Sequence, residues 1–365
     1  MDILIKISVF TIGSAITVMT IFSALSTFVL TRAARSQLNR VVFGFMRRIF
    51  DFILRFTNTY EQRDQIMAYY SPISLIMLVP VWYALIMLGY AAMYWSLGVG
   101  DWFADIRYSG SSLLTLGFAT SDNPFVTILS FSEALIGLIL VALLMAYLPT
   151  MYAAFSRREQ AVSMLEVRAG NPPSALEMLL RFNRIHGLDK LGDYWKTWET
   201  WFADIEESHT TLPALVFFRS PRSDNSWITA AGTVLDTASL TLSSVDIPYE
   251  SSAALSIRAG FLALRRIANY FDIPNPQNPQ YPADPISITR EEFNEALTKL
   301  EDAGLPLKAD REQAWKDFAG WRVNYDRVLL VLCSLVMAPH APWSSDRAKK
   351  FKMPPLFIPK RKQVS

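Results

Sequence analysis

The sequence predicts an all-α membrane protein. We expect three transmembrane helices, one re-entrant helix with its loop between the second and third, and an all-α cytoplasmic domain. Only 19% of the 365 residues are charged and 51% are hydrophobic, whereas soluble domains carry about 25% charged residues. Three long apolar runs precede residue 150, and apolar residues recur at helical spacing after residue 157.

The three apolar runs cover residues 7–30, 73–97 and 126–148, and Glu133 is the only charged residue within them. Each is long enough to cross a bilayer, which takes roughly 20 residues. The first run is too long for a signal peptide and no small-residue cleavage site follows it, so we expect it to stay as an anchor. Residues 328–338 are also apolar but too few to span, which predicts a buried helix containing Cys333.

Arginines predict the orientation. Seven lie between the first and second runs, whereas only Arg107 lies between the second and third. We expect a multi-pass protein of the cell membrane (inner or plasma membrane). Because basic residues accumulate in cytoplasmic loops, we expect its N-terminus on the outer side and its C-terminal domain in the cytoplasm. The loop that contains Arg107 then faces outside.

The first loop, within residues 32–71, predicts a basic amphipathic helix. Its apolar residues recur at helical spacing from 38 to 56. The arginines between them are Arg35, Arg40, Arg47, Arg48 and Arg55. Such a helix suits the inner membrane surface, with its arginines against anionic lipid headgroups. The alternative is a helix packed on the cytoplasmic domain, with solvated arginines.

The loop between the second and third runs predicts a re-entrant structure. Asp101 or Asp105 is expected to start a short helix over residues 103–114, too short to cross the membrane. A second segment follows, with the sequence Thr115, Leu116, Gly117, Phe118 and Ala119, and residues 121–124 would form its exit turn. Irregular backbone at membrane depth is tolerated only where it is buried in protein or lines a water-filled path.

At these residues the chain resembles the potassium-channel superfamily, whose filter reads Thr-Val-Gly-Tyr-Gly, often with Phe for Tyr. The resemblance covers roughly residues 73–158, and Thr115 to Phe118 match position by position. It implies a two-helix pore module in which backbone carbonyls and the Thr115 hydroxyl replace the hydration shell of K⁺. Because the chain has one pore loop and fourfold coordination needs four, we expect a homotetramer.

Two positions depart from the family. Ala119 stands where the family has its second glycine, and Thr120 stands where an aspartate often follows. That glycine adopts a backbone conformation that costs a residue with a Cβ about 1 kcal/mol. Ala119 is therefore expected to alter the outermost ion site, and Na⁺ is an alternative permeant ion.

The third run supplies the remaining candidate residues. Glu133 is expected to brace the filter from behind, since an intramembrane carboxylate is a candidate functional site; the alternative is a carboxyl near the headgroups without a special task. Its candidate partners are Arg107, Ser111, Ser112 and Thr115. Gly137 predicts either a hinge or a close helix approach. Pro149 is expected to end the inner helix and set the constriction there.

The C-terminal domain is predicted to be helical and regulatory, with Trp195, Trp198, Trp201 and Phe202 in its core. Helical periodicity covers residues 172–185, 194–207, 251–271, 290–304 and 311–336, a proline-rich linker covers 275–285, and the tail is basic. It has no nucleotide-binding fingerprint, no metal-ligand spacing and no nucleophile–base pattern, so we expect neither an enzyme nor a cofactor beyond the permeant cation. Arg219 and Arg222 either bind an anion or belong to a capped loop.

Four regions follow: a transmembrane helix (1–31), the basic interfacial helix (32–71), the pore module (72–156) and the cytoplasmic helical domain (157–365). The predicted function is a tetrameric cation channel that conducts K⁺, gated by the inner helix and the cytoplasmic domain. A sodium-permeable channel and a non-conducting membrane sensor or scaffold are the alternatives. The expected partners are other copies of the chain and membrane lipids, and the net charge of +2 is too small to predict nucleic acid.

Overall fold

The computed structural model describes residues 2–28 and 36–348 and contains helices but no strand within those ranges. The predicted all-α class is confirmed there. Arg35 and nearly all of the basic tail lie outside the described residues. The chain divides into two compact units: an N-terminal unit, Met1–Asp51 with Tyr69–Ala153, and a C-terminal unit, Phe52–Ala68 with Ala154–Ser365.

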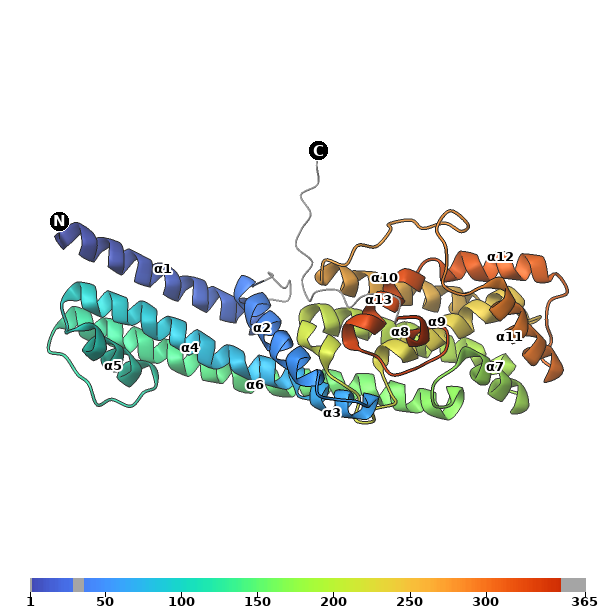
Figure 1. Cartoon of the computed structure of the whole chain (residues 1–365), viewed down its shortest axis with the longest axis horizontal. Coiled ribbons are helices and arrows are strands. Elements are labelled where there is room, and N and C mark those ends of the chain that lie inside the picture. The colour runs from blue at the N-terminus through green and yellow to red at the C-terminus, as the bar shows by residue number, and fades with distance from the viewer. Residues whose placement is uncertain (1, 29–35, 349–365) are drawn as a thin grey trace. The chain divides into compact units, whose positions relative to one another are not determined.

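Three long helices carry the predicted apolar runs (Figure 1). They are α1 (Asp2–Phe28), α4 (Tyr70–Leu97) and α6 (Pro124–Ala169). Each is long and apolar enough to cross a membrane. The predicted helix end at Pro149 is wrong, because α6 continues through it to Ala169. A proline removes one i→i−4 hydrogen bond, and the helix-forming residues on both sides sustain the remaining ladder.

The pairing of α1 with α4 depends on two glycines. A Cβ built on Gly13 would lie 2.4 Å from the carbonyl oxygen of Gly89, and one built on Gly89 would lie 2.4 Å from Oγ1 of Thr17. Only glycine lets the two backbones approach this closely, as in other membrane helix pairs. Further along the pair, the Trp82 indole donates a 3.2 Å hydrogen bond to Ser23.

In the basic helix α2 (Gln37–Leu54), one stripe of apolar side chains is buried and another is exposed. Val42, Met46 and Phe50 are buried, whereas Val41 and Phe45 are more than half exposed. The prediction that Arg47 faces lipid is wrong. Arg47 is 5% exposed, binds Asp51 at 3.0 Å and lies over the Tyr70 ring, because its position falls on the buried stripe. Arg48 and Arg55 are exposed, and Arg40 is half-buried.

The C-terminal unit is a helical bundle around α9 (Trp227–Ser244), all 18 residues of which are buried. The other helices of this unit are α3 (Tyr60–Ala68), α7 (Ala175–Arg184), η1 (Leu188–Lys190), α8 (Leu191–Thr211), η2 (Pro213–Phe217), α10 (Ser251–Tyr270), α11 (Arg290–Asp302), α12 (Arg311–Arg322), α13 (Asp326–Val336) and α14 (Ser345–Ala348). The helix predicted over 311–336 is two helices, α12 and α13. The four predicted core aromatics of α8 are buried, as is the free thiol of Cys333.

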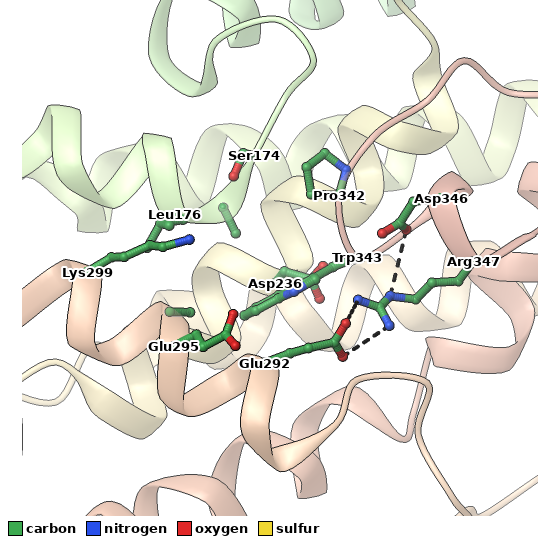
Figure 2. A pocket seen from close by; sticks show the side chains of 12 residues that line it. Ser174, Leu176, Asp236, Glu292, Glu295, Lys299, Pro342, Trp343, Asp346 and Arg347 are labelled. Carbon is green, nitrogen blue, oxygen red and sulfur yellow. Dashed lines mark hydrogen bonds and ion pairs between the residues drawn. The ribbon is translucent and has the colours of Figure 1, made fainter.

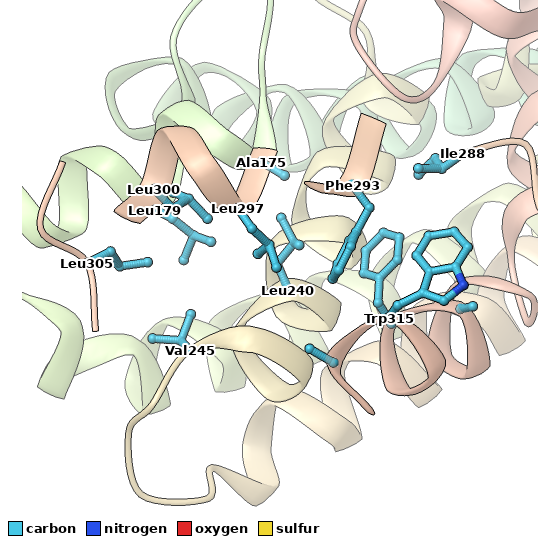
Figure 3. Packing of buried hydrophobic residues seen from close by; sticks show 13 residues of the cluster. Ala175, Leu179, Leu240, Val245, Ile288, Phe293, Leu297, Leu300, Leu305 and Trp315 are labelled. Carbon is cyan, nitrogen blue, oxygen red and sulfur yellow. The ribbon is translucent and has the colours of Figure 1, made fainter. Parts of the chain in front are cut away.

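One apolar cluster joins α7, α9, α11 and α12 (Figure 3). Its centre is aromatic: the ring of Phe293 lies 5.3 Å from that of Trp315 and 5.1 Å from that of Phe318, centroid to centroid. The start of α11 is fixed by a capping box between Thr289 and Glu292, which satisfies two backbone N–H groups at once. The cluster therefore holds α11 at a defined place on the central helix.

Candidate functional site

A short helix, α5 (Trp102–Leu113), lies between α4 and α6 in the chain and packs on α4. Its start is confirmed at Asp101, whose side chain accepts a 2.8 Å hydrogen bond from the backbone N–H of Ala104. This is an N-cap, which satisfies a backbone donor that the helix leaves free. With 12 residues, α5 is about 18 Å long at 1.5 Å per residue and cannot cross a bilayer.

The segment after α5 is tied back to that helix through its N–H groups. The N–H groups of Leu116 and Gly117 both donate to the carbonyl of Ser111, at 2.8 and 3.2 Å. The N–H of Ala119 donates to the Ser111 hydroxyl at 3.0 Å. Ser111 itself is 1% exposed. A buried serine thus fixes three backbone donors of the candidate filter toward the helix.

The carbonyl oxygens of residues 115–119 are free by comparison. They accept no hydrogen bond from any residue that the structure describes. The side chains nearby are also uncovered in the single chain, with Leu116 61% and Phe118 58% exposed. The segment therefore offers a run of unsatisfied acceptors beside exposed apolar surface.

The backbone of this segment differs from a uniformly extended strand. Thr115 and Gly117 have positive φ angles, +56° and +72°. At Gly117 glycine meets this demand without cost, whereas a β-branched threonine adopts it rarely. Ala119 is not among the described residues with positive φ, so the conformational cost expected at Ala119 does not arise there. The Thr115 hydroxyl donates to the Leu114 carbonyl at 2.7 Å.

Glu133 of α6 is fully buried. The Tyr94 hydroxyl of α4 donates to its Oε2 at 2.9 Å, and the Ser109 hydroxyl of α5 donates to its Oε1. Glu133 therefore joins all three helices of the module. None of the four candidate partners from the sequence analysis hydrogen-bonds to it among the described residues.

Ser112 and Arg107 have other contacts. The Ser112 and Ser130 hydroxyls lie 2.7 Å apart and link α5 to α6. Arg107 lies over the Phe118 ring, with its guanidinium carbon 5.9 Å from the ring centroid. Both residues thus contact α6 or the candidate filter, but neither contacts Glu133. Sequence reasoning missed Tyr94 and Ser109, although a serine in a short amphipathic helix and a tyrosine in an apolar span are signals for buried polar contacts.

Gly137 lies where α6 meets the end of α5. A Cβ on Gly137 would be 2.2 Å from the carbonyl oxygen of Leu113, and the Tyr83 hydroxyl donates to the Gly137 carbonyl at 2.7 Å. The structure therefore gives Gly137 the close approach that was one of its two predicted roles. Pro149 lies within α6 and is exposed.

The last part of α6 is anchored in the C-terminal unit by Arg158, which is fully buried. Its guanidinium donates to the carbonyls of Leu215 and Phe218 at 2.8 and 2.7 Å and binds Glu159. His209 lies 3.2 Å from the same guanidinium. Burial, and then the charge of Arg158, hold the pKa of His209 well below its usual value. The imidazole is therefore neutral.

The anion site considered at Arg219 and Arg222 is not supported. Arg219 pairs with Asp64 at 2.9 Å, and Arg222 pairs with Glu166 and Asp224 at 3.0 and 3.1 Å. Carboxylates of the chain already neutralise both guanidinium groups. The capped-loop alternative fits these contacts.

No protein-family model matches this chain, and no match is found among curated proteins or solved structures.

Proposed function

We propose that the protein is a homotetrameric cation channel that conducts K⁺, with residues 115–119 of four chains forming its selectivity filter. The observation that carries this proposal is the polarity of that segment. Its N–H groups at Leu116, Gly117 and Ala119 are bonded back to Ser111, while the carbonyls of residues 115–119 have no donor among the described residues. Carbonyl oxygens held in this way can replace the hydration shell of a cation.

The setting of the segment supports the same function. It follows a helix too short to span and lies between two helices that are long and apolar enough to cross a membrane. Irregular backbone at membrane depth needs burial in protein or a water-filled path. In a tetramer, the four segments would cover one another and enclose such a path.

The exposed face of α6 supports assembly from several copies. Apolar side chains on this face alternate at spacings of three and four residues. The exposed residues in this series are Ile128, Phe131, Leu135, Leu138, Ala142 and Met145. A heptad spacing of this kind is typical of helices that pack against each other. Lipid would cover the same face in a monomer, so oligomeric state distinguishes the two arrangements.

Two alternative functions make different predictions. A sodium-permeable channel would have the same assembly but little discrimination between K⁺ and Na⁺. A non-conducting sensor or scaffold would not need four chains.

In the proposed channel, conduction would be gated through α6, since the C-terminal part of this helix is held in the C-terminal unit by Arg158.

Potassium release from liposomes, together with oligomeric state, tests the proposal. The purified full chain should be tetrameric in mild detergent by light scattering and should release K⁺ when reconstituted. The Gly117→Ala variant changes the proposed filter alone: it should remain tetrameric and release K⁺ more slowly. A monomer or dimer that releases no K⁺ would exclude the channel and favour the sensor.

A further inference from the structure

The C-terminal unit contains a cavity of about 350 Å³ that the proposed conduction does not use (Figure 2). It lies among α7, α9, α11 and residues 342–347. Its lining is mixed: carboxylates, a lysine, an arginine and a serine surround the apolar surfaces of Leu176 and Trp343. A volume of a few hundred Å³ is typical of sites for small organic molecules.

The deepest polar group of the cavity is Asp236. Its side chain is 2% exposed, and both of its hydrogen bonds, from Arg322 and Tyr325, go to Oδ1. Oδ2 has no hydrogen-bond partner among the residues that the structure describes. Because Asp236 lines the cavity, Oδ2 is an acceptor available to a ligand.

Two further carboxylates keep free oxygens beside it. Oδ1 of Asp346 is buried and ion-paired with Nε of Arg347 at 3.7 Å, whereas its Oδ2 accepts no hydrogen bond from the residues that the structure describes. Glu295 of α11 has neither an ion pair nor a hydrogen bond within the described part of the chain. Glu292, by contrast, is paired with Arg347 at 2.7 Å. The cavity therefore offers Asp236, Asp346 and Glu295 to a positively charged group.

The cavity also offers donors. Lys299 follows Glu295 by one helical turn, yet it has no ion pair among the described residues. Ser174 is the N-cap of α7 but makes no side-chain capping bond, so its hydroxyl and the first N–H groups of α7 are available. In Figure 2, Lys299 and Leu176 lie at one side of the cavity and Asp346 with Arg347 at the other. A helix N-terminus and a lysine favour an anionic group.

We propose that this cavity binds a small zwitterion of the amino-acid class. The ammonium group would bind Asp236, Asp346 and Glu295, and the carboxylate would bind Lys299 and the start of α7. The aliphatic part would lie against Trp343 and Leu176. A lysine and an indole beside the carboxylates favour such a ligand over a bare metal ion. This site does not depend on the proposed conduction, because all its residues belong to the C-terminal unit.

Calorimetric titration of the full chain in mild detergent tests the site. The probes are the common L-amino acids, each compared with its decarboxylated amine and its deaminated carboxylate. We expect at least one amino acid to bind with a Kd of about 1 mM or tighter, and both of its half-ligands to bind about tenfold more weakly. Binding by none of the amino acids overturns the proposal. So does an amine or a carboxylate that binds as tightly as the amino acid.

Substitutions on α11 then locate the ligand. Lys299→Met and Glu295→Gln change exposed residues that line the cavity and should each weaken binding about tenfold or more. Glu291→Gln, an exposed carboxylate on the same helix outside the cavity, is the matched control and should bind normally. Circular dichroism checks the fold of each variant. Unchanged affinity in folded Lys299→Met would contradict the assignment.

Discussion

The hydroxyl of Tyr94 donates a 2.9 Å hydrogen bond to Oε2 of Glu133 and joins α4 to α6. Ser109 of α5 binds the other oxygen of the same carboxylate, so one buried side chain fixes the short helix between its two neighbours. Residues 116–119, in the candidate filter, are attached to that short helix through Ser111. The position of the candidate filter thus depends on Glu133.

Glu133→Ala should destabilise the N-terminal unit and slow K⁺ release. The substitution leaves the hydroxyls of Tyr94 and Ser109 buried without their acceptor, which costs about 1–3 kcal/mol. Thermal unfolding in detergent and liposome flux measure the two effects. Tyr90→Phe is the milder control, because the Ser132 hydroxyl it leaves also bonds the Leu129 carbonyl at 2.7 Å. Equal effects of the two substitutions would contradict a special role for Glu133.

Gly137→Ala should disrupt the contact of α5 with α6. The added Cβ would lie 2.2 Å from the Leu113 carbonyl oxygen, and overpacking of this kind costs about 1–3 kcal/mol. Gly110→Ala is the control within the same module, because its Cβ would meet only the Met87 sulfur at 3.7 Å. Unfolding temperatures should fall for Gly137→Ala alone. A hinge without close packing would instead leave the stability of Gly137→Ala unchanged and alter gating.

Ala119→Gly should increase discrimination of K⁺ over Na⁺. Glycine adds the left-handed backbone conformation to those available at this position, whereas Ala119 does not adopt a positive φ in this structure. The N–H of residue 119 can keep its bond to Ser111, since the backbone donor is unchanged. Permeability ratios from bi-ionic reversal potentials provide the measurement, and an unchanged ratio would contradict a role for residue 119 in ion selectivity.

The C-terminal unit should lose stability as the pH falls below about 6.5. His209 is neutral in the fold because burial and Arg158 lower its pKa. In the unfolded chain His209 binds a proton near the usual histidine pKa of about 6.5. The free energy of unfolding therefore falls as the pH drops from about 6.5 toward the lower pKa of the folded state, by up to about 1.4 kcal/mol per pH unit.

His209→Gln should reduce this loss. Unfolding of both proteins is compared at about pH 7 and about pH 5.5, a window set by the unfolded histidine pKa. The other titrating groups are the same in both chains. They include Asp236, whose pKa is raised by burial, while the charge of Arg322 acts to lower it. The difference between the chains therefore belongs to His209. An equal pH dependence of the two proteins would contradict a lowered pKa of His209 in the fold.

Periodicity and apolar length were sufficient to predict the long helices and most of the C-terminal ones. They did not predict α9, because every residue of this helix is buried and a helix covered on all sides has no polar face to produce a period. The continuation of α6 past Pro149 was missed for a different reason: a proline is only a local signal, and the helix on both sides of it outweighs that signal.

The candidate site was predictable only as a segment. The order of Thr115 to Ala119 between two apolar runs marks its place in the chain, but the partners of Glu133 lie on separate helices. Ser109 and Tyr94 are brought together by the packing of α5 on α4, which depends on side-chain geometry rather than spacing. The cavity lined by Asp236 was not predictable at all, since Asp236 lies on the helix that sequence analysis missed.

Current through the purified protein in a planar bilayer, with K⁺ on one side and Na⁺ on the other, tests the central claim most directly. The account predicts a cation current whose reversal potential lies toward the K⁺ limit and which Gly117→Ala diminishes. A reversal potential near zero would support the sodium-permeable alternative. A preparation that contains no tetramer and carries no current would contradict a filter at residues 115–119. So would a current that Gly117→Ala leaves unchanged.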